Sequence, residues 1–112
     1  MTNNVDFTKP LLSYENQIEL IETIQRKDKK SEQALAQLIE YNICFVYSVS
    51  KQYIDQGLSD EQLIKAGTEG LTTAAGKYKG HYRKFKFITF AIWWIRQAVK
   101  EALKAKEYNT TK

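Results

Sequence analysis

The sequence predicts an all-α protein: a compact bundle of about four helices that forms a single domain over residues 1–112. Apolar residues recur at three- and four-residue steps in four successive segments, which is the period of an amphipathic helix. Strand-like alternation is nearly absent, and no internal repeat, low-complexity tract or Pro/Gly-rich linker divides the chain. A chain of 112 residues can bury one hydrophobic core of modest size.

The first two helices are predicted from capping residues and apolar spacing. Ser13 is a suitable N-cap for a helix that ends in the charged stretch 26–30. The apolar positions of this helix are Ile18, Ile21 and Ile24. Ser31 is the expected cap of a second, longer helix that continues until Gly57 and should form the centre of the core. Its apolar positions are Leu35, Leu38, Ile39, Phe45, Val46 and Val49.

A third helix is predicted after Ser59, because Ser59 and Gln62 have the spacing of a capping box. Its apolar stripe consists of Leu63, Ile64, Leu71 and Ala74 or Ala75. Gly67 and Gly70 lower its intrinsic helicity, since glycine inside a helix costs about 1 kcal/mol relative to alanine. Two glycines three residues apart therefore indicate either close approach by another backbone or a functional role.

The fourth helix is predicted from about Phe87 to Tyr108, and its two faces differ in character. The face assigned to the core carries Ile88, Ala91, Ile92, Ile95, Val99, Ala102 and Leu103. The opposite face carries Phe90, Trp93, Gln97, Lys100 and Lys104, flanked by Trp94 and Glu101. Large aromatics on a polar face indicate a contact surface, unless another helix covers them.

The charge of the chain is unevenly distributed. Residues 1–76 contain 7 Lys/Arg and 11 Asp/Glu, a net charge of −4, whereas residues 77–112 contain 10 and 2, a net charge of +8. A polyanion should therefore dock on the C-terminal third, although basic residues that merely solvate a terminal helix would give the same count.

The mixture of side chains in that basic third favours unpaired nucleic acid. Aromatic rings stack on bases, lysines neutralise phosphates, and the amide of Gln97 can bind a base edge. The segment before the fourth helix interleaves both kinds of residue: Lys77, Tyr78, Lys79, Tyr82, Arg83, Lys84, Phe85 and Lys86. An anionic membrane also attracts Lys, Trp and Tyr, but the apolar face of this helix is needed for a core, so no membrane partner is expected.

Several classes of function are not expected. The chain has no membrane-length apolar run and no signal-peptide pattern, which makes the cytoplasm the expected compartment. One cysteine and one histidine, Cys44 and His81, supply no metal site, and no cofactor is expected. Cys44 lies in an apolar run and is expected to be a buried, inert thiol. No catalytic motif is present, so the protein is not expected to be an enzyme.

The stretch FITFAIWWIRQAV, residues 87–99, resembles the conserved region 2 signature of the sigma-70 family. The resemblance extends upstream through residues 42–59, 63–71 and 77–87, and residues 10–30 resemble the region 1.2 segment of primary sigma factors. About 100 residues are covered. Nothing resembling regions 3 and 4, which would include a helix-turn-helix for a −35 element, is present.

The resemblance implies a non-enzymatic domain that recognises promoters. Such a domain binds the β′ coiled coil of RNA polymerase core and captures flipped bases from the non-template strand of the −10 element. The aromatic melting region would comprise Phe85, Phe87, Thr89, Phe90, Trp93 and Trp94. Gln97 and Lys100 would contact the upstream edge of the −10 element, and Asn42 and Lys51 occupy conserved polar positions. Tyr78 joins the expected nucleic-acid contacts, with phosphate contacts from Lys77, Arg83, Lys84, Lys86, Lys100 and Lys104.

The resemblance places polymerase binding on a segment that departs from the family pattern. The expected contacts are Gln62, Lys65, Ala66, Thr68 and Thr72. Family members usually have Asp-Leu-Ile-Gln-Glu-Gly where this chain has Gln-Leu-Ile-Lys-Ala-Gly at 62–67, so both acidic side chains are missing. Phe90 replaces a usual tyrosine, Lys79 stands near a position that is often acidic, and the 78–87 interval has one extra residue.

Two alternatives to a promoter-melting domain remain open. The chain could be a sigma-like regulator that contacts RNA polymerase or another sigma factor without melting DNA, which would explain the altered 62–68 segment. It could also be a sequence-blind single-strand binder unrelated to transcription, although that interpretation leaves the long resemblance unexplained. Preference for a −10 strand, binding to polymerase without a DNA preference, and sequence-blind binding would distinguish the three.

Overall fold

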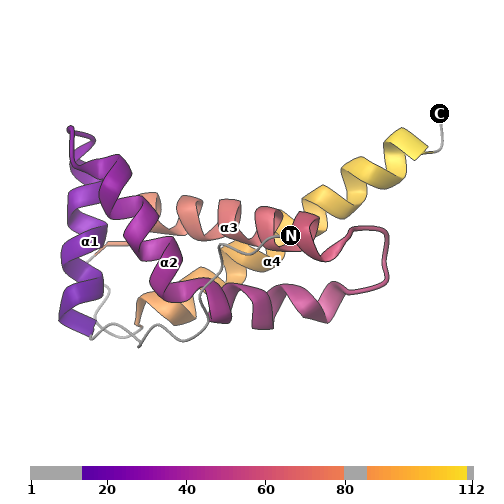
Figure 1. Cartoon of the computed structure of the whole chain (residues 1–112), viewed down its shortest axis with the longest axis horizontal. Coiled ribbons are helices and arrows are strands. Elements are labelled where there is room, and N and C mark those ends of the chain that lie inside the picture. Colours follow the sequence, from indigo (N-terminus) through magenta and orange to yellow (C-terminus); the bar gives the residue numbers. More distant parts are fainter. Residues whose placement is uncertain (1–13, 80–85, 111–112) are drawn as a thin grey trace.

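The computed structural model describes residues 14–79 and 86–110, with side chains described at 15–79 and 86–106. Within these ranges the chain forms four α-helices and one 3-10 turn, and no strand (Figure 1). The elements are α1 (Tyr14–Arg26), α2 (Ser31–Ser50), η1 (Lys51–Tyr53), α3 (Asp60–Lys77) and α4 (Phe87–Thr110). The predicted all-α fold is confirmed.

The helices pack around the long α3–α4 contact, which is the most extensive interface between elements. α2 lies against α3 and also contacts α4, while α1 packs on α2 and touches α3. Figure 1 shows α1 at one end of the molecule and the last turns of α4 projecting from the other. The molecule is accordingly elongated, with extents of 44 × 28 × 28 Å.

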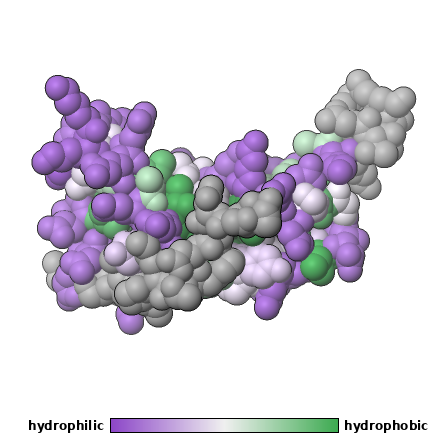
Figure 2. Space-filling model, in the orientation of Figure 1, coloured by the Kyte–Doolittle hydropathy of each residue, from purple (hydrophilic) through white to green (hydrophobic). Residues whose placement is uncertain are grey.

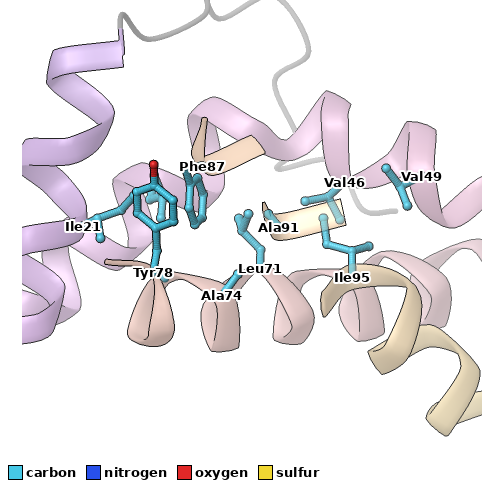
Figure 3. Packing of buried hydrophobic residues seen from close by; sticks show 11 residues of the cluster. Ile21, Val46, Val49, Leu71, Ala74, Tyr78, Phe87, Ala91 and Ile95 are labelled. Carbon is cyan, nitrogen blue, oxygen red and sulfur yellow. The ribbon is translucent and has the colours of Figure 1, made fainter. Parts of the chain in front are cut away.

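The core has two parts along this elongated body. The larger cluster joins residues of all four helices and includes Tyr78, which lies between α3 and α4 (Figure 3). The residues labelled in Figure 3 are Ile21, Val46, Val49, Leu71, Ala74, Tyr78, Phe87, Ala91 and Ile95. A smaller cluster of Leu63, Ala66 and Val99 is covered by Tyr53, Leu58, Ala102 and Leu103. α4 contributes to both clusters, which fixes its rotation about its own axis.

The beginning and end of α2 differ from the prediction. Ser31 is the first helical residue rather than the cap, and its hydroxyl donates to the Asp28 carbonyl at 2.7 Å. At its other end α2 stops at Ser50 and a 3-10 turn follows. The turn to α3 then uses positive backbone φ angles at Asp55 (65°) and Gly57 (125°), so Gly57 belongs to the connection and not to the helix end. The expected cap of α1, Ser13, lies outside the described residues.

The capping box at the start of α3 is confirmed. The Ser59 hydroxyl accepts from the Gln62 backbone N–H at 3.2 Å, and the Gln62 side-chain oxygen accepts from the Ser59 N–H at 2.8 Å. Two of the backbone donors that a helix start leaves unpaired are thereby satisfied. These two side chains define the start of α3.

Two of the three glycines of α3, Gly67 and Gly70, allow close packing against its neighbours. A Cβ built on Gly70 would lie 2.5 Å from the Trp94 carbonyl oxygen and 2.6 Å from the Ile95 Cα, so only glycine fits there. A Cβ on Gly67 would overlap the Ser50 side-chain oxygen of α2. Close approach by another backbone is therefore confirmed at Gly70, and it places the backbone of Trp94 directly against α3.

The described residues show three further features. Cys44 is exposed, which corrects the expected burial, because Asn42, Ile43 and Val46 form the buried face of α2 at this point. In the view of Figure 2, hydrophilic residues dominate the described surface and apolar residues form separate small patches. None of the described helices is long and apolar enough to cross a membrane.

Candidate nucleic-acid interface

Adjacent tryptophans of α4 form the centre of the candidate interface. Trp93 is 57% exposed, whereas Trp94 is half-buried against the larger core cluster. Their ring centroids lie 4.8 Å apart and the ring planes meet at 86°. Trp94 therefore supports Trp93 edge to face, and Trp93 presents its ring to solvent.

Trp94 is itself held in place from both α3 and α4. The Lys77 ammonium lies 5.4 Å from the centroid of the Trp94 ring, a cation–π distance, and the Phe90 ring lies 6.2 Å from it. Gly70 packs directly against the Trp94 carbonyl, as described above. The supporting ring is thus fixed, and a fixed platform loses little conformational entropy when a ligand stacks beside it.

Phe90 lies at the border between this exposed surface and the core. It was expected on the exposed face of the helix, but it is half-buried and packs against Tyr78 with ring centroids 5.5 Å apart. The covering residue comes from the end of α3, which the helical wheel of α4 alone does not include. Phe90 therefore acts first as a link between the core and Trp94.

Three residues expected to contact nucleic acid are buried, which corrects those predictions. Tyr78 and Phe87 have exposed fractions of 0% and 1%, and their rings meet edge to face at 5.5 Å inside the core. Asn42 is 3% exposed, and its amide nitrogen donates to the Leu38 carbonyl at 2.8 Å within α2. None of the three presents its side chain to a ligand in this structure, because α3, α4 and α2 pack over them.

The tryptophan pair borders a hollow of about 260 Å³ between α3 and α4, which we call the tryptophan hollow. It is lined by Gly70, Thr73, Trp93, Trp94, Gln97, Ala98 and Glu101. Only the tryptophans and Gln97 were predicted site residues. Glu101 was placed at the flank of this helix face, and its spacing of four residues from Gln97 is the signal that joins it to the hollow. No sequence signal identifies Thr73 or Ala98 as part of the hollow. Thr73 belongs to a different helix, α3, and Ala98 lies at the core-facing edge of α4.

Of the remaining predicted contacts that the structure describes, only Gln97 lines the hollow. Gln97 is half-buried beside the tryptophans, and its neighbours along the exposed face of α4 are charged or polar. The exposed members of the predicted set are Lys77, Lys86, Thr89, Lys100 and Lys104. Arg83, Lys84 and Phe85 lie outside the described residues. Where described, the predicted phosphate-binding lysines are accessible, and their binding role stays a prediction.

Gln25 of α1 is a structural residue that sequence reasoning missed. Its side-chain nitrogen donates to the Ala75 carbonyl at 2.8 Å and to the Tyr78 carbonyl at 2.6 Å. α1 thereby holds the end of α3, where Lys77 and Tyr78 meet the aromatic residues of α4. No sequence signal identifies this contact, because its partners are 50 and 53 residues away.

The segment expected to bind polymerase contains exposed residues and residues that are buried or half-buried within the fold. Lys65 and Gln62 are exposed, although the Gln62 side chain also completes the capping box. Ala66 is only 5% exposed and packs with Leu63 and Val99, so its predicted contact with polymerase is corrected. Thr68 and Thr72 are half-buried, and the Thr72 hydroxyl donates to the Thr68 carbonyl at 3.0 Å.

The described charged side chains near the tryptophan hollow lie on α3 and α4. In the part of the chain that the structure describes, no group of three or more His, Cys, Asp or Glu side chains could hold a metal ion. The described side chains of this surface offer stacking, hydrogen bonding and attraction of an anion.

Comparison with known proteins identifies the family. The sequence model of the "Sigma-70 region 2" family matches residues 38–107, which span most of α2, all of α3 and most of α4. Residues 10–30 precede that match, so their resemblance to region 1.2 stays a prediction.

Curated relatives agree with the family match. RNA polymerase sigma factor SigA of Bacillus sp is 39% identical over 94 residues, which are 84% of this chain and 24% of that protein. SigA of Clostridium acetobutylicum is 40% identical over 95 residues, with the same shares of the two chains, and SigA of Lactococcus lactis is 38% identical over 94 residues, again 84% of this chain and 24% of the relative. The chain thus spans about a quarter of the length of the relatives it matches. It belongs to the sigma-70 region 2 family.

Proposed function

We propose that this chain acts in transcription initiation as a non-catalytic sigma-factor domain, which captures unpaired bases from the non-template strand of a −10 element. The observation that carries the proposal is the 57% exposed Trp93 ring, held edge to face on Trp94 beside the tryptophan hollow. Sequence similarity to SigA proteins supports the link to transcription initiation.

The energetics favour capture of bases that have already left the duplex stack. Flipping a base costs a few kcal/mol, and stacking on an aromatic side chain returns about 1–3 kcal/mol per base. Exposed lysines along the same face of α4, Lys100 and Lys104, add attraction for the phosphates. The Gln97 amide at the hollow can hydrogen-bond a base edge, so the surface can combine affinity with selectivity.

RNA polymerase core is the proposed protein partner, through its β′ coiled coil and the exposed residues of α3. Gln62 and Lys65 are available there, whereas the acidic side chains usual in the family are absent. If the partner presents arginines, each missing carboxylate removes a charge-assisted hydrogen bond of about 1.5–3 kcal/mol. We therefore expect core binding to be weaker than that of a typical family member.

The test is fluorescence anisotropy with two labelled single strands, one carrying an A/T-rich −10-like element and the other its scrambled sequence. Each strand is titrated with the protein, with and without core polymerase. The proposal predicts preference for the −10-like strand that becomes stronger with core. Equal binding of both strands, unaffected by core, would contradict promoter recognition and leave general single-strand binding.

A second candidate function is a sigma-like regulator that contacts polymerase or another sigma factor without melting DNA. The observation that favours it is the altered α3 surface, where Lys65 stands exposed in a segment that is usually acidic. In the same experiment, this function predicts that core polymerase binds the protein while neither strand is preferred.

A further inference from the structure

Among the described residues, Glu101 is the only acidic one that lines the tryptophan hollow. It lies in the strongly basic third of the chain, where residues 77–112 contain 10 Lys/Arg and 2 Asp/Glu. Its carboxylate takes part in no ion pair or side-chain hydrogen bond among the described residues. A negative charge on a surface that binds a polyanion lowers the affinity, unless that charge accepts a hydrogen bond from the ligand.

The geometry of the hollow places this carboxylate beside a position that suits a single base. Glu101 lies four residues after Gln97, so the two side chains are neighbours on one face of α4, next to Trp93. The volume of about 260 Å³ is below the range of about 300–1,000 Å³ that is typical of small-molecule sites. Because Trp93, Gln97 and Glu101 follow one another at four-residue steps on α4, a base stacked beside Trp93 would present its edge to both polar side chains.

The donors and acceptors at the hollow favour one class of base. An ionised carboxylate only accepts hydrogen bonds, whereas the Gln97 amide both donates and accepts. The Thr73 hydroxyl already donates to the Glu69 carbonyl at 3.1 Å. Cytosine, adenine and guanine carry exocyclic amino groups that donate to a carboxylate, and glutamate accepts from cytosine N4 in known complexes. Thymine has no exocyclic amino group, and its one ring donor, N3–H, lies between two carbonyl oxygens that a carboxylate repels.

We propose that Glu101 is a specificity-determining residue that selects a base with an exocyclic amino group, over thymine, at the tryptophan hollow. This inference rests on the proposed function, because it concerns which base the same surface accepts. Stacking and phosphate contacts do not distinguish one base from another, so selectivity at this position would come from Glu101.

The test uses four labelled strands that differ at one position, A, C, G or T, within an otherwise uniform thymine tract. The native protein should bind the strands with an amino-bearing base roughly five- to tenfold more tightly than the all-thymine strand. Glu101→Gln should remove this preference, since an amide also donates to a thymine carbonyl, and should raise the affinity for the all-thymine strand. The control Glu61→Gln removes the same charge from an exposed position at the start of α3 and should keep the preference.

The outcomes separate the two proposals. Binding of all four strands with equal affinity by the native protein, or an unchanged preference in Glu101→Gln, overturns the selectivity of Glu101 and leaves the proposed function standing. If no strand binds, the proposed function fails, and titration with cytidine and thymidine monophosphates followed by NMR decides the inference. Shifts of the Glu101 and Trp93 signals with cytidine but not thymidine monophosphate support it, and their absence overturns it.

Discussion

Some described aromatic residues of the last third of the chain lie in opposite environments. Tyr78 and Phe87 are fully buried and join α3 to α4, whereas Trp93 is 57% exposed. All three are aromatic and lie within 16 residues of one another in a basic segment. The comparison teaches that residue type indicates a stacking surface only together with the position of each side chain in the packed structure.

The largest expected difference between the buried and the exposed aromatic residues is in their contribution to the free energy of unfolding. Phe87→Ala removes a ring that is 1% exposed and should lower the free energy of unfolding by about 3–5 kcal/mol. Trp93→Ala removes an exposed ring and should change stability by less than about 1 kcal/mol. Urea denaturation followed by circular dichroism measures both, and equal destabilisation would contradict the division into buried and exposed aromatics.

The next effect concerns the close approach that positions Trp94. Gly70→Ala places a methyl group against the Trp94 carbonyl and the Ile95 Cα, and should cost about 1–3 kcal/mol through overpacking. Gly76→Ala is the matched control, since a Cβ there meets nothing within 4 Å. Because alanine favours the helix, the control should gain about 0.5–1 kcal/mol. Thermal melting of the two variants gives the comparison, and a stable Gly70→Ala protein would contradict the tight α3–α4 contact.

The third expected effect is on the affinity for single-stranded DNA. Trp93→Ala should weaken single-strand affinity by about 1–3 kcal/mol, because one stacked base loses its platform. Ile54→Ala is the control, since Ile54 is the other exposed large hydrophobic residue of the described chain and does not line the tryptophan hollow. Anisotropy titration with one −10-like strand measures both, and equal losses would indicate nonspecific apolar contact rather than stacking.

The smallest effect concerns a single phosphate contact. Lys100→Gln should weaken binding to every strand to a similar degree and reduce the slope of log K against log salt by about 0.7, the value for one contact on a single strand. Glu101 next to it should instead affect base preference. Titrations at several salt concentrations test this, and an unchanged slope would remove Lys100 from the phosphate contacts.

The fold could be predicted from the sequence because its signals are local. Apolar spacing and the Ser59–Gln62 capping box act within one or two turns, and both are found in the structure. The predicted end of α2 at Gly57 was wrong, because the helix stops at Ser50 and the turn to α3 uses a positive φ at Asp55. The residue type at position 55 does not by itself indicate that conformation.

The sequence predicted the exposure of site residues correctly only where the phase of a single helix decides it. The helical phase of α4 correctly placed Trp93 on the exposed face. Burial of Tyr78, Phe87 and Asn42 depends on which helices cover them, and the Lys77–Trp94 and Gln25–Tyr78 contacts join residues 17 and 53 positions apart. Such contacts follow from the packed arrangement, so spacing along the chain does not indicate them.

The most direct test of the central claim is the fluorescence of Trp93 in a Trp94→Phe variant, which leaves Trp93 as the only tryptophan. Titration with a −10-like single strand should quench its emission in parallel with binding measured by anisotropy, because a stacked base contacts the ring. Binding without any change in Trp93 emission would contradict the claim that this ring captures unpaired bases.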